Sequence, residues 1–189
     1  MIPTPMSPIQ SITVYCSSSS DVATVYFDAA AELGRAIARQ GWRLVYGGND
    51  CGCMGALAHA ARAAGGKVIG ITPQLLVDHG IADENCDELI VTATMRERKA
   101  LLESRGDAFI TLPGGLGTLE EIFEILVGKT LGFHAKPIVL LNIAGFYDPL
   151  LAMIELGIEQ KFIRPKARKM LYVSTTVEGA IGHLRECAG

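Results

Sequence analysis

The 189-residue sequence lacks the features that several large classes of protein require. Its net charge is −3 and its lysines and arginines are dispersed, so an extended basic surface for DNA or RNA is not expected. No apolar run reaches about 18 residues, so no helix is expected to span a membrane. The N-terminal stretch MIPTPMSPIQ has neither the basic nor the apolar region of a secretory signal peptide. Together these absences predict a cytoplasmic protein.

Disulfide and metal-binding patterns are missing too. The five cysteines are odd in number and show no framework spacing: Cys16, Cys51, Cys53, Cys86 and Cys187. Two of them form C-x-C rather than the C-x-x-C of zinc and redox motifs, and no histidine cluster joins them. We therefore expect free thiols in a reducing compartment, and no metal site.

Two nucleotide-binding fingerprints are also absent. The turn after the first predicted strand reads CSSSSD instead of G-x-G-x-x-G. Gly115 and Gly117 lead to Glu120, where a third glycine would be needed. The sequence contains no G-x-x-x-x-G-K-[ST], so a P-loop is excluded. A dinucleotide oxidoreductase is thus disfavoured, whereas a mononucleotide or a sugar phosphate fits.

The sequence does contain an alternation of apolar strands and helices. Strands are predicted at 11–16, 42–48, 67–72, 88–92, 107–113, 136–142 and 171–174. Helices are predicted at 21–40, capped by Asp21, and at 53–66, 95–106, 118–132, 145–160 and from 177 onward. Residues 1–10 are predicted to be a flexible N-terminus and 73–87 to be irregular. The alternation predicts one Rossmann-like α/β domain over 11–189, with a doubly wound, mostly parallel sheet covered by helices on both faces.

Four loops should meet where the strands of such a sheet end, and a ligand binds at that edge. They span residues 16–20, 47–55, 94–99 and 113–121. Three of the four consist largely of glycine, serine or threonine, which present backbone N–H and hydroxyl groups to an anion. This arrangement predicts a phosphorylated ligand.

The run MRERK (95–99) places three cations at a helix start, where the helix dipole disfavours them. One interpretation is a solvated polar face in which Glu97 pairs locally. The alternative is that a phosphate at this edge makes the cations favourable, most simply through a forked contact from Arg98.

Three motifs at their mutual spacing resemble a known family: YGG…MG (46–55), MRERK (95–99) and PGGLGTLEE (113–121). The sequence is similar, over residues 12–151, to the LONELY GUY family of cytokinin-activating phosphoribohydrolases, often mislabelled lysine decarboxylases. The resemblance implies hydrolysis of the N-glycosidic bond of a nucleoside 5′-monophosphate, either an N6-modified adenylate or AMP. The products would be the free base and ribose 5-phosphate, for cytokinin activation or nucleotide salvage. Neither a metal nor an organic cofactor is expected.

The resemblance also assigns residues. It implies that Arg98 and Glu121 are catalytic. The implied substrate-binding residues are Ser18, Gly48, Met95, Arg98, Lys99, Gly114, Gly115, Leu116, Gly117, Thr118, Glu120 and Glu121. Four positions depart from the residues common in the family: Ser17 and Asn49 replace glycines, Gly80 replaces a glutamate and Gly128 a tryptophan. We expect the last two near the base pocket, so the identity of the base is left open.

Glu121 has two interpretations. Thr118-x-x-Glu121 matches a capping box, which needs no chemistry. Alternatively, its carboxylate stabilises the positive charge that develops on the sugar as the base leaves, or activates the attacking water. Two charges about 5 Å apart repel by roughly 3 kcal/mol at a dielectric of 20, so Glu121 should face away from the phosphate. We favour the catalytic role, with capping as a second role.

Two further expectations concern assembly and class. Helix 118–132 has more apolar positions than one buried face needs: Leu119, Ile122, Phe123, Ile125, Leu126 and Val127. Because dimers are also usual in the family, we expect a homodimer. The main alternative function is a non-catalytic nucleotide or cofactor carrier of the same fold. Lysine decarboxylation would need pyridoxal phosphate, and no lysine stands in a recognisable Schiff-base setting.

Overall fold

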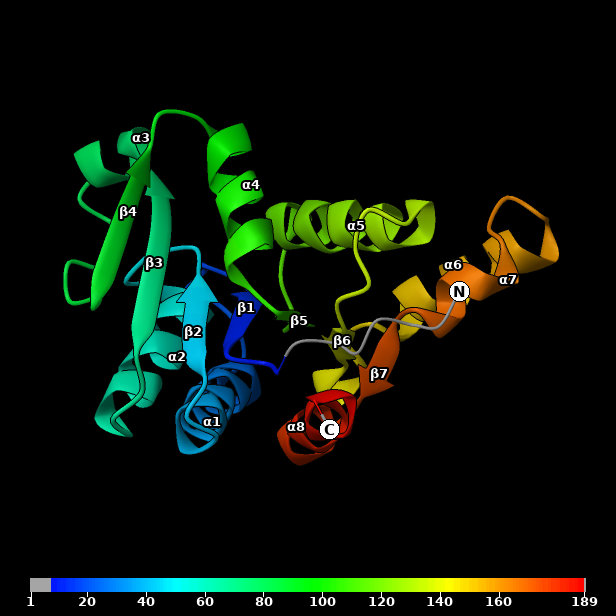
Figure 1. The fold of residues 1–189 in the computed structure, drawn as a ribbon, viewed down its shortest axis with the longest axis horizontal. Helices are drawn as coiled ribbons and strands as arrows, with labels where there is room; N and C mark the ends of the chain where they lie inside the picture. The colour runs from blue at the N-terminus through cyan, green and yellow to red at the C-terminus, as the bar shows by residue number, and fades with distance from the viewer. Residues whose placement is uncertain (1–7, 189) are drawn as a thin grey trace.

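The computed structural model describes residues 8–188 and contains one seven-stranded sheet (Figure 1). The strands are β1 (Ser11–Tyr15), β2 (Arg43–Tyr46), β3 (Val68–Pro73), β4 (Glu88–Thr92), β5 (Ala108–Thr111), β6 (Ile138–Leu141) and β7 (Tyr172–Ser174). All neighbouring strands pair in parallel, in the order β4-β3-β2-β1-β5-β6-β7. The prediction of a doubly wound, Rossmann-like α/β fold is therefore confirmed.

Helices cover both faces of this sheet (Figure 1). They are α1 (Thr24–Arg39), α2 (Gly52–Ala63), α3 (Gln74–Asp78), α4 (Met95–Arg105), α5 (Leu116–Leu131), α6 (Asp148–Glu159), α7 (Pro165–Lys169) and α8 (Val177–Ala188), with a 3-10 turn at Ile143–Gly145. Helices α1, α2 and α8 pack on one face, and α4 and α5 on the other. Within residues 8–188, no helix is long and apolar enough to cross a membrane.

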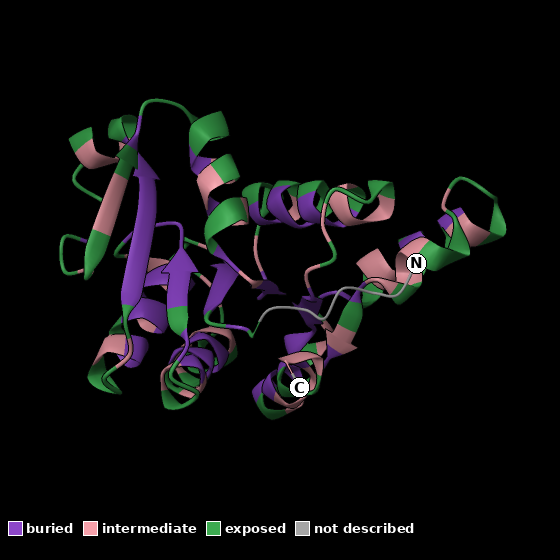
Figure 2. Ribbon diagram, viewed as in Figure 1, coloured by how far each residue is buried: buried purple, intermediate pink, exposed green. Residues whose placement is uncertain are grey.

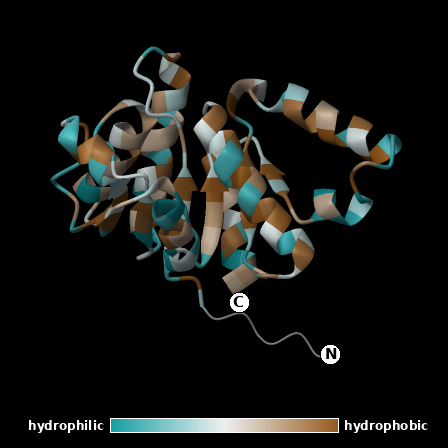
Figure 3. Ribbon diagram, turned by 90° about the horizontal axis from the view of Figure 1, so that it is seen from above, coloured by the Kyte–Doolittle hydropathy of each residue, from teal (hydrophilic) through white to brown (hydrophobic). Residues whose placement is uncertain are grey.

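The central strands are mostly apolar because both of their faces are buried: every residue of β1, β3, β5 and β6 is buried, whereas the edge strands β4 and β7 are partly exposed. In β1, Ile12 and Val14 join the core under α1, α2 and α8, whereas Tyr15 joins the core under α4 and α5. Figure 2 shows this burial along the central strands, and Figure 3 shows their hydrophobic residues in the middle of the molecule. A continuous apolar run is thus what a central parallel strand requires.

The chain changes direction along the sheet next to β1, which lies between β2 and β5. Strands β2 to β4 extend to one side, and β5 to β7 extend to the other. The loops after β1 and β5 therefore diverge, and this divergence opens the crevice in which open α/β sheets bind ligands.

Several predicted local features were wrong. Helix α1 begins at Thr24 after Ala23, so Asp21 does not cap it; its backbone N–H instead donates to Ser19 Oγ in the polar loop. The predicted irregular segment 73–87 contains the short helix α3, and α7 was not predicted. Both missed helices span only five residues, too few for a periodic apolar pattern.

The predicted flexible N-terminus lies mostly outside the described residues. Of the part that is described, Ile9 is buried in the core. The backbone N–H of Gln10 donates to Asp107 Oδ2. These contacts attach the chain to the domain just before β1.

Candidate active site

A cavity of about 340 Å³ lies at the carboxyl ends of the strands. It is lined by Cys16, Ser17, Ser18, Ser19, Asn49, Met54, Leu76, Met95, Arg98, Gly115, Gly117, Thr118, Glu120 and Glu121. These residues come from the loops after β1 and β2 and from the starts of α2, α3, α4 and α5. The volume is in the range of small-molecule sites, and the lining combines hydroxyls, glycine backbone, one cation and two carboxylates.

Helix α4 places Arg98 in this cavity. Thr94 caps the helix by accepting from the Glu97 N–H, and the Glu97 carboxylate accepts in return from the Thr94 N–H. A capping box therefore does occur in this protein, but at α4. The side chain of Arg98 reaches Gly47 just after β2, where a Cβ on that residue would collide with its Nη2. Glycine at 47 is thus what lets the arginine pass.

Arg98 and Glu121 form a buried ion pair. Arg98 Nη1 donates to Glu121 Oε1 at 3.0 Å, and the two side chains are only 6% and 8% exposed. Arg98 Nε also donates to the Ile71 carbonyl at 3.0 Å, and Nη2 to the Gly47 carbonyl at 3.4 Å. Three bonds leave two of the five guanidinium N–H groups for a ligand.

Burial raises the pKa of the Glu121 carboxyl above its ordinary value, although the positive charge of Arg98 acts to lower it. A carboxylate with a raised pKa is a better proton acceptor than an exposed one, which suits a general base. Its setting is very different from a helix cap. Helix α5 begins at Leu116 after Gly115, so the predicted Thr118–Glu121 capping box is not formed.

Glu120 has a different environment. It is largely exposed, and its Oε1 accepts from Lys99 Nζ at 2.6 Å, while Glu124 lies 3.2 Å from the same ammonium. These hydrogen bonds raise the pKa of Lys99. The two adjacent acids therefore have separate partners: exposed Glu120 pairs with Lys99, whereas Glu121 is buried beside Arg98.

The start of α5 has the geometry of an anion site. Its first backbone N–H groups have no partner within the helix, and no side chain among the described residues caps it. Gly115 and Gly117 line the cavity together with the serine-rich loop 17–19. A Cβ at Gly114 would collide with the Thr118 side chain, so glycine is required there for the loop to close on the helix.

The structure brings together eight of the predicted site residues: Ser18, Met95, Arg98, Gly115, Gly117, Thr118, Glu120 and Glu121. The other four predicted site residues do not line the cavity, although each is next in sequence to a residue that does: Gly48, Lys99, Gly114 and Leu116. Six lining residues were not assigned: Cys16, Ser17, Ser19, Asn49, Met54 and Leu76. The first five lie in loops that were predicted to reach this edge, but Leu76 belongs to α3, in the segment predicted to be irregular.

Two departures from the family pattern were expected near the base pocket, yet neither lines this cavity. Gly80 follows α3 and borders a neighbouring hollow with Asp50 and Glu84. Gly128 lies in the second half of α5, where a Cβ would be 3.5 Å from the His134 ring. Within one chain, they do not shape the candidate site.

Comparison with known proteins supports the motif-based reading. A family model described as "Possible lysine decarboxylase" matches residues 54–184. The chain is 46% identical to the cytokinin riboside 5′-monophosphate phosphoribohydrolase of Mycobacterium tuberculosis, over 94% of this chain and 92% of that protein. It is 45% identical to the protein of the same name from Rhodococcoides fascians, over 97% and 91%. The chain belongs to the LONELY GUY family.

Solved structures share the fold. The molybdenum cofactor carrier protein of Chlamydomonas reinhardtii superposes with a TM-score of 0.71, at 26% identity, over 94% of this chain and 97% of that one. The LONELY GUY fold is thus similar to that of a carrier, and the fold alone does not separate the two functions.

The decarboxylase description does not fit this site. A Schiff-base lysine needs a depressed pKa so that its amine is unprotonated. Lys99, the lysine beside the cavity, is paired with two carboxylates that raise its pKa. The site of this LONELY GUY protein therefore does not provide the lysine that pyridoxal phosphate requires.

Proposed function

We propose that the protein hydrolyses the N-glycosidic bond of a nucleoside 5′-monophosphate, an N6-modified adenylate or AMP, to the free base and ribose 5-phosphate. The observation that carries this proposal is the buried Arg98–Glu121 pair in a cavity that also contains an uncapped helix start. Such a substrate has a phosphate that requires N–H donors and a sugar that requires a carboxylate in the transition state.

The substrate would span three regions of the cavity. Its phosphate would bind at the start of α5, near Gly115, Gly117 and the serine loop. Its base would lie against the apolar side chains of Leu76 and Met95. The ribose would then lie between these ends, with its anomeric carbon facing Glu121.

In the reaction, the bond between C1′ and the base nitrogen breaks and the base leaves with the bonding electrons. The Glu121 carboxylate stabilises the positive charge on C1′ and accepts a proton from the attacking water, whose oxygen bonds to C1′. The base takes up one proton from solvent as it leaves, and Glu121 releases to solvent the proton that it took from the water. Arg98 holds Glu121 in position, and its remaining N–H groups contact the substrate.

The test is chromatography of the products that purified protein forms from AMP, isopentenyladenosine monophosphate and the other nucleoside monophosphates. Free base and ribose 5-phosphate in equal amounts would support the proposal. Release of adenosine and inorganic phosphate, or of no product from any nucleotide, would refute it.

A non-catalytic carrier is the second candidate, because the fold resembles that of a molybdenum cofactor carrier. A carrier needs the N–H cradle but not the buried acid. Burying the Arg98–Glu121 ion pair costs several kcal/mol of desolvation, which favours a functional role for the acid. A carrier would bind its ligand, which calorimetry detects, and release it unchanged, whereas an enzyme would release products in the chromatographic test.

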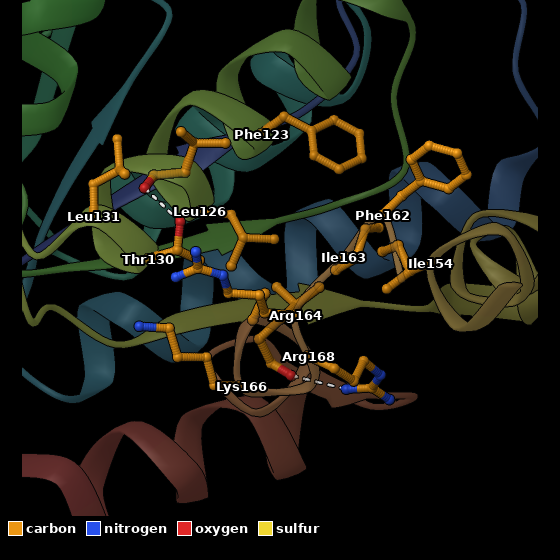
Figure 4. A pocket seen from close by; sticks show the side chains of 13 residues that line it. Phe123, Leu126, Thr130, Leu131, Ile154, Phe162, Ile163, Arg164, Lys166 and Arg168 are labelled. Atoms are coloured by element: carbon orange, nitrogen blue, oxygen red, sulfur yellow. Dashed lines mark hydrogen bonds between the residues drawn. The ribbon is translucent and has the colours of Figure 1, made fainter. Parts of the chain in front are cut away.

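We also propose a homodimer that forms through the outer face of α5. An apolar groove of about 370 Å³ runs between α5 and the segment around α6 and α7. Figure 4 shows Phe123, Leu126 and Leu131 on one wall and Ile154 and Phe162 on the other. Leu131 and Phe162 are 65% and 89% exposed, and a surface of this kind favours association.

We also propose that the protein is cytoplasmic. Its five cysteines all lie among the described residues and all are free. Free thiols suit a reducing compartment.

A further inference from the structure

Four side chains carry a buried polar atom that has no hydrogen-bond partner among residues 8–188: Asn49, Thr72, Thr111 and His134. Of these, only Asn49 lines the candidate active site. Asn49 is 5% exposed, and the atom without a partner is its carboxamide oxygen. A buried polar atom without a partner destabilises the folded protein, so a ligand that supplies a donor to it restores the missing hydrogen bond.

The backbone on both sides of Asn49 is fixed. The Gly48 carbonyl accepts from the Asp83 N–H at 2.8 Å, and the Asp50 N–H donates to the Ile81 carbonyl at 3.0 Å. Asp83 is itself fully buried and accepts from Tyr46 at 2.7 Å. These bonds hold the backbone at Asn49 in place, and the residue lines the cavity.

The position of Asn49 relates it to the sugar. It follows Gly47 by two residues, and the Gly47 carbonyl accepts from Arg98, the partner of Glu121. In the proposed function, Glu121 faces the anomeric carbon C1′, and C2′ is bonded to that carbon. A carboxamide also matches a cis-diol, because its oxygen accepts from one hydroxyl and its NH₂ donates to the other.

We propose that Asn49 recognises the ribose hydroxyls and makes the enzyme selective for ribonucleotides over 2′-deoxyribonucleotides. This inference rests on the proposed function and assigns a specificity residue to the same site. With a deoxyribose in the cavity, the carboxamide oxygen stays buried and unpaired, which is the most effective way for a polar site to reject an analogue. Glycine at this position, common in the family, would supply no such group.

The experiment compares kcat/KM for AMP and for 2′-deoxyadenosine 5′-monophosphate in wild type, Asn49→Ala and Asn85→Ala. Asn85 is the matched control, since it is an exposed asparagine outside the cavity. The ribose preference is the ratio of kcat/KM for AMP to kcat/KM for the deoxynucleotide. Because the intrinsic reactivity of the two substrates is the same in every variant, a change in this ratio reports on the protein. We expect Asn49→Ala to lower the ribose preference at least about tenfold and Asn85→Ala to leave it unchanged.

Two outcomes would overturn the inference. One is an unchanged preference in an Asn49→Ala protein that melts normally. The other is a changed preference between AMP and inosine 5′-monophosphate with an unchanged preference for ribose over deoxyribose. That result would assign Asn49 to the base. If wild type cleaves no nucleotide, the proposed function fails, but calorimetric binding of the same two nucleotides still tests Asn49.

Discussion

Arg98 Nη1 lies 3.0 Å from Glu121 Oε1, and both side chains are almost completely buried. Helix α4 supplies the cation and α5 the anion, so the pair joins two helices that flank the cavity. Removing one charge from a buried pair leaves the other without a partner in a medium of low dielectric. The stability and the chemistry of the site are therefore coupled.

We expect Arg98→Ala to lower the free energy of unfolding by about 3–5 kcal/mol, because Glu121 is left as an unpaired buried charge. Adding Glu121→Gln should recover part of that loss, since the remaining group is then neutral. Urea unfolding of the two single variants and the double variant measures the coupling. Losses that simply add would show that the pair is not coupled.

The pH dependence of kcat/KM should reflect the raised pKa of Glu121. A carboxyl with a raised pKa stays protonated to a higher pH, and only the ionised form is active. Activity should therefore fall, as the pH decreases, through a midpoint above the ordinary glutamate value of about 4.3. The substrate phosphate also titrates, at about pH 6, so the pH dependence of the residual rate of Glu121→Gln is the control. A limb that persists unchanged in that variant belongs to the phosphate.

Phosphate recognition at the start of α5 can be tested at one backbone group. Leu116 occupies the first helical position, where proline is well tolerated, and its side chain is 86% exposed. Leu116→Pro deletes a single N–H, whereas Leu116→Ala keeps it. We expect the proline variant to lose about tenfold in kcat/KM for AMP relative to the alanine variant, the effect of one charge-assisted hydrogen bond.

The same two variants should act equally on adenosine, which lacks the phosphate, and wild type should cleave adenosine poorly. If Leu116→Pro lost the same factor in kcat/KM on AMP and on adenosine, the phosphate would not bind at the start of α5.

Much of the fold followed from the sequence, because continuous apolar strands and glycine-ended helices have few alternative arrangements. The site was harder to predict than the fold. MRERK and PGGLGTLEE predicted the cavity edge, but Arg98 was expected to face a phosphate, and its bond to Glu121 was not foreseen. Contacts between α4 and α5 depend on how the two helices pack, which local sequence does not encode. The Thr118–Glu121 capping box matched the pattern and was wrong, because α5 begins two residues before Thr118.

Association through α5 should respond to charge. Val127 is 52% exposed and lines the same groove as Arg164, Lys166 and Arg168, so Val127→Lys should weaken the dimer by adding a fourth cation to this surface. Val25→Lys is the control, because Val25 is 43% exposed on α1, outside the groove. Sedimentation velocity at micromolar concentration distinguishes the forms. A wild-type protein that sediments as a monomer would contradict the proposed dimer.

The most direct measurement of the central claim compares product formation by Glu121→Gln and Glu120→Gln. Glutamine keeps an oxygen for Arg98, so Glu121→Gln should cost only about 1–3 kcal/mol in stability and still bind substrate. It removes the charge beside the developing oxocarbenium ion, and turnover should fall at least about a hundredfold. Glu120→Gln, which breaks an exposed pair with Lys99, should lose much less. A folded Glu121→Gln protein that turns over at the wild-type rate would contradict the account.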